Sequence, residues 1–198
     1  MALLGKAALA MWWDMSAAVR WGFEHWHAHE HFPERLAIPG FRRASRWMHA
    51  GRGEGVFVMY ELEDPAVLAS PAYMARLHAP TAWSQRLMPE HRHMVRSQCE
   101  VLESRGALTA RHALTVRLSP VPGQAEPLRA ALRSLGDSVA MQPGLVGLHL
   151  LRHQAPAIAP TEEQRIRGLA DRGADWVLVA CGYDVGAVQT LSESALSD

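Results

Sequence analysis

The sequence predicts a mixed α+β fold made of two like units, each with an antiparallel sheet. Strand and helix patterns follow one another in the same order in the two halves of the 198 residues. A Pro-Gly-apolar stop follows the first helix of each half, at Pro39-Gly40-Phe41 and, 104 positions later, at Pro143-Gly144-Leu145. This is the pattern of a duplicated unit, so we expect residues 1–106 to form the first copy and residues 107–198 the second.

The first half has the order strand, helix, strand, strand, helix, strand. Apolar or alternating runs predict its strands over residues 7–15, 41–49, 56–62 and 91–102. Ser16 is a helix N-cap, and the helix that it starts continues to about residue 37. A second, shorter helix is expected within residues 63–80. This order is that of the split β-α-β unit of ferredoxin-like domains.

The second half repeats the order but lacks its last strand. Its strands are expected over residues 111–120, 143–153 and 175–184, and its helices over residues 123–141 and 185–196. Residues 154–174 stand where the first copy has a short hairpin, and we expect an inserted surface loop with one helical turn. Either this copy has a three-stranded sheet or the chain ends early.

A four-stranded sheet with helices on one face leaves its other face bare, and that face must be buried. Two copies in one chain can do this for each other. The expected product is therefore a pseudo-dimeric α/β barrel, and a homodimer of whole chains would add a further interface.

The composition argues against two classes of partner. Lys plus Arg equals Asp plus Glu at 20 each, so no net charge attracts nucleic acid. No apolar run approaches the roughly 20 residues that span a bilayer, so no membrane partner is expected. Cys99 and Cys181 fit neither a disulfide framework nor a Cys-x-x-Cys site, which favours the cytoplasm. No phosphate loop or nucleotide fingerprint is present, and no cofactor is expected.

A histidine stands at every second position of HWHAHEH, residues 25–31. On an α-helix His25 and His29 share one face, and His27 and His31 share another. Either pair could present two imidazoles to one metal, but the glutamate of a His-Glu-x-x-His zinc helix is missing. Solvated or capping histidines are the alternative, and we assign no metal site.

His31 is the best candidate for a catalytic residue because it stands beside a helix-ending proline, Pro33. From there it could point into a cleft between helix and sheet, where burial and Glu30 would tune its pKa toward neutrality. Such an imidazole could move a proton to or from a carbon acid, with His27 as a second candidate. The alternative is that His31 bonds a backbone carbonyl and holds the turn.

Several other residues are candidates for contact with a ligand. Trp26 and Tyr60 could line a pocket, although packing in the core is the alternative for both. Arg43 and Arg46 are three positions apart in a strand and point to opposite faces, so only one can bind an anion in the cavity, and we take Arg46. His91 is a weaker candidate, for which a solvated rim is favoured.

The first helix and the strand after it resemble those of EthD-like proteins in the dimeric α/β-barrel superfamily. Their pattern is Phe, Trp-Tyr, Glu-His-x-Pro and Pro-Gly-Phe, with arginines in the next strand. The matching residues are Phe23, Trp26, Glu30, His31, Pro33, Glu34, Arg35, Pro39, Gly40, Phe41, Arg43 and Arg46. The resemblance continues through VMYELEDPAVLASPAYMARLHAPTAW, whereas the second half matches mainly in element order. His27 stands where a tyrosine usually follows the tryptophan.

The resemblance implies a protein that binds or transforms a small hydrophobic compound, aromatic or polyketide-like, by proton-transfer chemistry. The residues implied are His31, Glu30 and His27 for the chemistry and Trp26, Tyr60 and Arg46 for the ligand. One alternative is a non-catalytic binding or assembly module. Another is a haem- or metal-dependent oxygenase, since related barrels include both.

Overall fold

The computed structural model describes residues 3–107, 110–154, 161–168 and 172–194. It divides into two compact units: the larger is Gly5–Cys99 with Gln154–Gly173, and the smaller is Met1–Leu4, Glu100–His153 and Ala174–Asp198. The units therefore differ from the predicted copies 1–106 and 107–198 in three segments. Residues 1–4 and 100–106, expected in the first copy, belong to the smaller unit. Residues 154–173, expected as an insertion in the second copy, belong to the larger unit.

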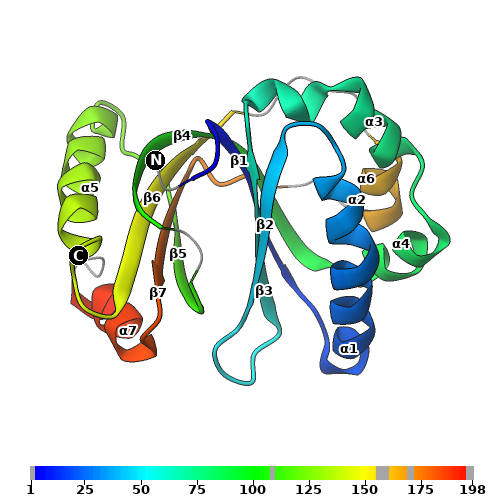
Figure 1. Cartoon of the computed structure of the whole chain (residues 1–198), viewed down its shortest axis with the longest axis horizontal. Helices are drawn as coiled ribbons and strands as arrows, with labels where there is room; N and C mark the ends of the chain where they lie inside the picture. The colour runs from blue at the N-terminus through cyan, green and yellow to red at the C-terminus, as the bar shows by residue number, and fades with distance from the viewer. Residues whose placement is uncertain (1–2, 108–109, 155–160, 169–171, 195–198) are drawn as a thin grey trace. The chain divides into compact units, whose positions relative to one another are not determined.

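The sheet of the larger unit has the ferredoxin-like strand order β2-β3-β1-β4 (Figure 1). Its strands are β1 (Ala7–Asp14), β2 (Phe41–Met48), β3 (Gly55–Leu62) and the first part of β4 (Arg92–Gly106). β3 pairs antiparallel with both β1 and β2, and Tyr60 lies opposite Leu9 and Ala44. The four strands predicted in the first half are thus present.

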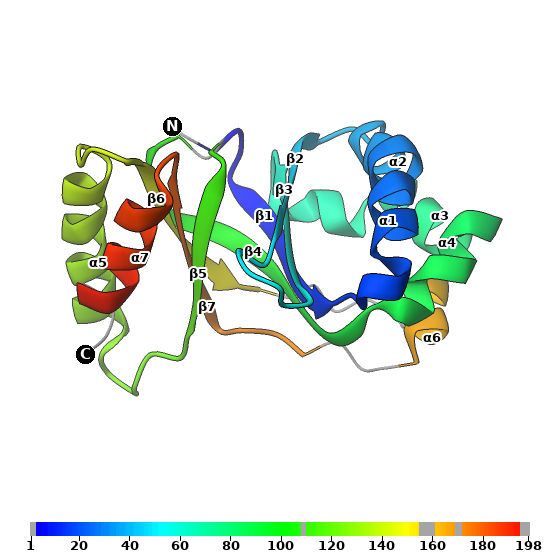
Figure 2. The ribbon, with the colours of Figure 1, turned by 90° about the horizontal axis from the view of Figure 1, so that it is seen from below.

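The helices of the larger unit cover one face of this sheet, as Figure 2 shows. They are α1 (Ala17–Trp26), the π-helical turn η1 (His27–His31), α2 (Phe32–Leu36), the 3-10 turn η2 (Pro65–Ala69), α3 (Pro71–His78), α4 (Ala82–Leu87), the 3-10 turn η3 (Met88–Glu90) and α6 (Glu162–Arg167). The helix predicted within residues 63–80 is split between η2 and α3 because Pro71 holds Ser70 in an extended conformation. α6 contacts α3 and η3. The consecutive elements α1, η1 and α2 are together called the first helix run.

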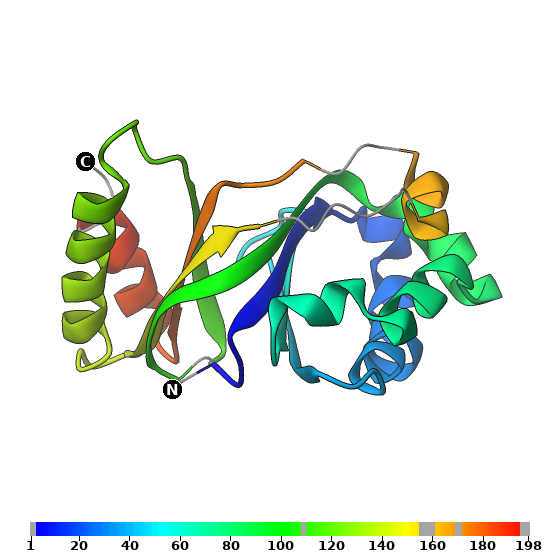
Figure 3. The ribbon, with the colours of Figure 1, turned by 90° about the horizontal axis from the view of Figure 1, so that it is seen from above.

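The smaller unit has the strand order β4-β6-β7-β5. Its elements are the second part of β4, β5 (His112–Leu118), α5 (Ala125–Val139), β6 (Leu145–His153), β7 (Trp176–Gly182) and α7 (Val185–Ser194). α5 and α7 lie on the same face of the sheet (Figure 3). The described part of the second half contributes three strands, as predicted, and the fourth strand of this sheet is β4, beside β6. The α+β class with antiparallel sheets is confirmed.

Each unit has its own apolar core. In the larger unit, side chains from β1, β3 and the first helix run meet, including Trp13, Phe23 and Trp26, all at most 3% exposed. In the smaller unit, Leu132 and Val139 of α5 pack against Leu148, Leu150 and Leu178 of the sheet. No helix among the described residues is long and apolar enough to cross a membrane.

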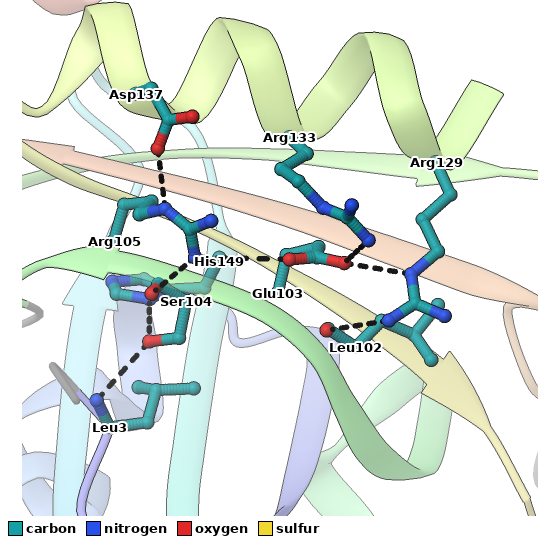
Figure 4. A network of polar contacts seen from close by, with 9 residues as sticks. All are labelled: Leu3, Leu102, Glu103, Ser104, Arg105, Arg129, Arg133, Asp137 and His149. Carbon is teal, nitrogen blue, oxygen red and sulfur yellow. Dashed lines mark hydrogen bonds and ion pairs between the residues drawn. The ribbon is translucent and has the colours of Figure 1, made fainter. Parts of the chain in front are cut away.

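An ion-pair network attaches α5 to β4 (Figure 4). Glu103 of β4 accepts hydrogen bonds from Arg129 Nε at 2.8 Å and Arg133 Nη2 at 2.7 Å. Beside it, Arg105 Nε donates to Asp137 Oδ1 at 2.5 Å. The hydrogen bond from Arg133 is the largest cause of the lowered pKa of Glu103. The carboxylate therefore stays ionised and holds the helix on the sheet.

Replacing this carboxylate by an amide, in Glu103→Gln, is expected to lower the free energy of unfolding by about 1 kcal/mol, because both arginine partners are partly exposed. Since the folded pKa is lowered, this stability is present above the unfolded pKa of Glu and is lost as pH falls through the folded pKa. Urea unfolding at pH 7 measures the change. Glu63→Gln, in an exposed pair with Arg42, is the control, and an equal loss in both variants would contradict the prediction.

Candidate functional site

A partly open cavity lies in the larger unit between the sheet and the helices. It is lined by Leu9, Met11, Trp13, Trp26, His27, His31, Arg35, Tyr60, Tyr73, Met88, His91, Met94, Arg96, Glu163 and Arg167. All atom-free space at the site, including the open mouth, amounts to about 460 Å³. The cavity has a volume of about 40 Å³, counted as the space open to the centre of a water molecule. One water needs roughly 10–15 Å³ by such a measure, so the cavity has room for a few waters or part of a small ligand.

A π-helical turn brings the first histidines to this cavity. The N–H of Phe32 bonds the carbonyl of His27, five residues back, in place of the usual four. Pro33 explains the wider turn, because it has no N–H for the carbonyl of His29 and its ring would clash there in a regular helix. His27 and His31 share the buried side, with ring centroids 5.3 Å apart and planes at 19°. Turns of this kind are frequent at functional sites.

Both imidazoles in this turn are buried and neutral. His27 is 1% exposed and His31 is 8% exposed. Burial, as the largest cause, lowers the pKa of each well below 6.5, and the charges of Arg46 on His27 and of Arg35 on His31 lower it further. In the described part of the chain, neither Nδ1 atom has a hydrogen-bond partner. Each ring can therefore donate or accept one further hydrogen bond, depending on its tautomer.

His91 is a third buried imidazole, although the sequence favours a solvated rim for it. Its Nδ1 donates to the carbonyls of Leu87 at 3.2 Å and Met88 at 3.0 Å, so the lone pair is on Nε2. Burial lowers the pKa of His91 to about 4. The ring lies 4.8 Å from that of Trp13. The signal that sequence reasoning missed is the helical turn before it, whose last carbonyls need a donor.

Two aromatic side chains add polar groups to the same cavity. Trp13 Nε1 and the Tyr60 hydroxyl are buried and have no hydrogen-bond partner among the residues that the structure describes. Burial raises the pKa of Tyr60, which keeps its hydroxyl protonated. An unpaired buried polar group costs about 1–3 kcal/mol. With the two Nδ1 atoms, the residues that line the cavity thus have four buried polar groups without a partner among the described residues.

A buried ion pair closes one side of the cavity. Arg35, 4% exposed, donates from Nη2 to Glu163 Oε1, although the two residues are 128 positions apart. Arg35 also lies over the ring of Tyr73, 5.8 Å from its centroid. Arg96 Nη2 donates to the hydroxyl of Tyr73 at 2.9 Å. α6, which carries Glu163, is therefore part of the cavity wall.

The structure brings four of the six predicted site residues to the cavity: His31, His27, Trp26 and Tyr60. Glu30 lies outside it, where Oε1 accepts from Trp26 Nε1 at 3.0 Å and from the Thr81 hydroxyl at 2.6 Å. Glu30 therefore orients Trp26, and it is not among the groups that shift the pKa of His31. This corrects the predicted tuning role.

Arg46 is also outside the cavity. Its Nη1 donates to the carbonyl of Glu24 at 3.3 Å, and its guanidinium lies over the ring of Phe23, 5.5 Å from the centroid. Arg46 thus lies on the face of β2 that carries α1, and these contacts hold its side chain against that helix. Its charge still acts on the site, because it lowers the pKa of His27 and opposes the raised pKa of Tyr60.

The described residues contain no group of three or more His, Cys, Asp or Glu side chains placed to hold a metal ion. The four histidines of the HWHAHEH stretch separate as predicted. His27 and His31 face the cavity, whereas His25 and His29 are exposed on the outer side.

No protein-family model and no curated protein matches the sequence. Solved structures match its fold. A provisionally named monooxygenase from Fusobacterium nucleatum has a TM-score of 0.63 at 6% identity, over 97% of this chain and 82% of that chain. A second, from Lactobacillus acidophilus, has a TM-score of 0.60 at 10% identity, over 96% and 82%. An anthrone oxidase-like protein has a TM-score of 0.64 at 14% identity, over 100% and 82%. At these identities the likeness shows a shared α+β fold.

Proposed function

We propose that the cavity of the larger unit binds a small aromatic compound with an acidic proton, and that His31 exchanges this proton with it. The main support is the pair of stacked, neutral imidazoles whose Nδ1 atoms have no partner among the described residues. Trp26, 4.5 Å from the His31 ring, and Trp13, 4.8 Å from the His91 ring, supply aromatic walls. Flat apolar walls with a few polar groups are typical of small-molecule sites.

Electrostatics indicate which ligands would react. A base with a lowered pKa takes protons only from fairly acidic groups, such as a phenol O–H or a C–H that lies between an aromatic ring and a carbonyl group. His31 Nδ1 would accept the proton, and the bonding pair would stay on the ligand as phenolate or enolate. The charge of Arg35, which disfavours a protonated His31, favours that anion. Trp13 Nε1 and the Tyr60 hydroxyl can donate hydrogen bonds to its oxygen.

The fold and the sequence resemblance support the same class of function. Two proteins of like fold are provisionally named monooxygenases and a third is anthrone oxidase-like, and the first helix resembles that of EthD-like proteins. We infer that the chain is an EthD-like member of the dimeric α/β-barrel superfamily. A homodimer and a cytoplasmic location stay predictions from the sequence.

Binding without turnover is the second candidate, because neutral imidazoles can hold a ligand by hydrogen bonds alone, without taking its proton. A haem fits the site poorly because the space admits a few water-sized molecules and not a porphyrin. No described trio of side chains is placed for a metal either, so we derive no step through haem or metal.

Phenol is expected to raise the melting temperature of the protein, whereas cyclohexanol, of similar size but neither aromatic nor acidic, raises it less. At 100 times the Kd, a ligand adds about 2.7 kcal/mol to the free energy of unfolding. His31→Phe keeps the stacked ring but removes both nitrogens, and Tyr60→Phe removes the hydroxyl. Both variants should lose most of the phenol-induced shift.

His78→Ala, an exposed position on α3, is the control and should keep the full shift. Equal shifts in the wild type and both cavity variants would remove the proposed site. Turnover is tested separately by deuterium exchange at the acidic methylene of 2-indanone. Exchange that needs His31 supports catalysis, and phenol binding without exchange supports the second candidate.

A further inference from the structure

Two of the four clustered histidines lie outside the cavity, on the outer side of the first helix run. His25 and His29 are exposed, and Trp21, 79% exposed, stacks on His25 with ring centroids 5.6 Å apart and planes at 13°. Trp83 of α4 contacts the same imidazole at 5.4 Å. These four side chains form an outer cluster that the proposed function does not use.

The two imidazoles of the outer cluster are held close together. Their ring centroids are 4.4 Å apart and their planes meet at 47°. His29 Nδ1 donates to the carbonyl of His25 at 2.9 Å, which fixes its tautomer and leaves the lone pair on Nε2. Histidines that bind metals usually donate the other ring N–H to a carbonyl or carboxylate in this way.

We propose that His25 and His29 bind a divalent transition-metal ion, Cu²⁺ or Zn²⁺, through one nitrogen of each ring, with water at the remaining positions. Imidazole suits both ions, and Cu²⁺ should bind more tightly than Zn²⁺. Trp21 and Trp83 restrict the His25 ring, so less freedom is lost when the ion binds.

The inner pair does not offer the same geometry. His27 and His31 are 5.3 Å apart and nearly parallel at 19°, so their planes face each other rather than converge on one point. They are also buried, where a bare cation would lose its hydration. A metal site on this helix is therefore expected outside the cavity, and its test is independent of the proposed function.

Titration of the untagged, metal-free full chain with CuCl2 or ZnCl2, followed by calorimetry, tests the site. One ion per chain is expected, with Cu²⁺ tighter than Zn²⁺. His25→Ala and His29→Ala should each weaken binding at least about tenfold. His78→Ala, which removes an exposed histidine of α3, should leave the affinity unchanged.

Tryptophan fluorescence gives a second readout, because bound Cu²⁺ quenches nearby indoles. Trp21→Phe should remove much of the Cu²⁺-induced quenching while the calorimetric affinity stays within about twofold. Affinity that is unchanged in both His25→Ala and His29→Ala would overturn the proposal, as would an equal loss in His78→Ala. Circular dichroism confirms that the exposed variants are folded.

Discussion

Acidification from pH 7 to pH 5 is expected to destabilise the larger unit by several kcal/mol. His27, His31 and His91 are buried in the neutral form, and their folded pKa values lie below the ordinary value of 6.5. Above pH 6.5 neither the folded nor the unfolded chain protonates them. Below it the unfolded chain takes up protons that the folded chain excludes, so stability is lost until the pH reaches each folded pKa. With a folded pKa of about 4, His91 alone accounts for about 2 kcal/mol at pH 5.

Urea unfolding at pH 7.0, 6.0 and 5.0 measures this loss, and the range stays above the region in which Glu103 titrates. His91→Gln can still donate to the carbonyls of Leu87 and Met88 but cannot titrate, and His27→Phe fills similar space without a titrating group. Both variants should show a smaller loss between pH 7 and pH 5. His78→Ala should follow the wild type. A wild-type free energy of unfolding that is constant over this range would contradict the buried, neutral state of the three rings.

Breaking the Arg35–Glu163 pair is expected to have the second large effect. Glu163→Leu leaves the Arg35 guanidinium buried without its carboxylate, and removing one partner of a buried pair costs about 3–5 kcal/mol. Because α6 carries Glu163 and forms part of the cavity wall, phenol binding should weaken as well. Urea unfolding at pH 7 and the phenol-induced shift measure the two effects.

The same helix offers a matched control. Glu162 pairs with Arg165 at 2.9 Å, but the two side chains are 43% and 60% exposed, so Glu162→Leu should cost less than about 1 kcal/mol. The double variant Arg35→Met/Glu163→Leu should recover most of the lost stability, because apolar groups of similar size can replace a buried pair. If Glu163→Leu were as mild as Glu162→Leu, the pair would not hold α6 in place.

The fold was predictable because it depends on periodic patterns within short segments. The two Pro-Gly stops and the alternating strands led to both ferredoxin-like halves without any long-range information. Segment 154–173 was placed in the wrong unit for the opposite reason. Its attachment depends on contacts between residues far apart in the chain, such as the buried pair of Glu163 with Arg35 across 128 positions, which no local pattern reveals.

The candidate site was predictable in part. His27 and His31 followed from their spacing, since residues four apart share a helix face. Glu30 comes four residues after Trp26, so the same rule puts these two side chains on one helix face. The structure shows a hydrogen bond between them. The partner of Glu30 could therefore have been predicted from the sequence. The burial of His91 and Arg35 was not, because the sequence does not show what packs over them.

Nitrogen NMR of the protein labelled with ¹⁵N-histidine tests the central claim most directly, with His27→Phe, His31→Phe and His91→Gln used to assign the signals. The cavity histidines should keep the shifts of neutral imidazole from pH 7 to pH 5.5, where an ordinary histidine with a pKa of about 6.5 protonates. Phenol should then shift the signals of His27 and His31, but not that of the exposed His78. Protonation of the cavity histidines near pH 6.5, or signals of His27 and His31 that phenol leaves unchanged, would contradict the account.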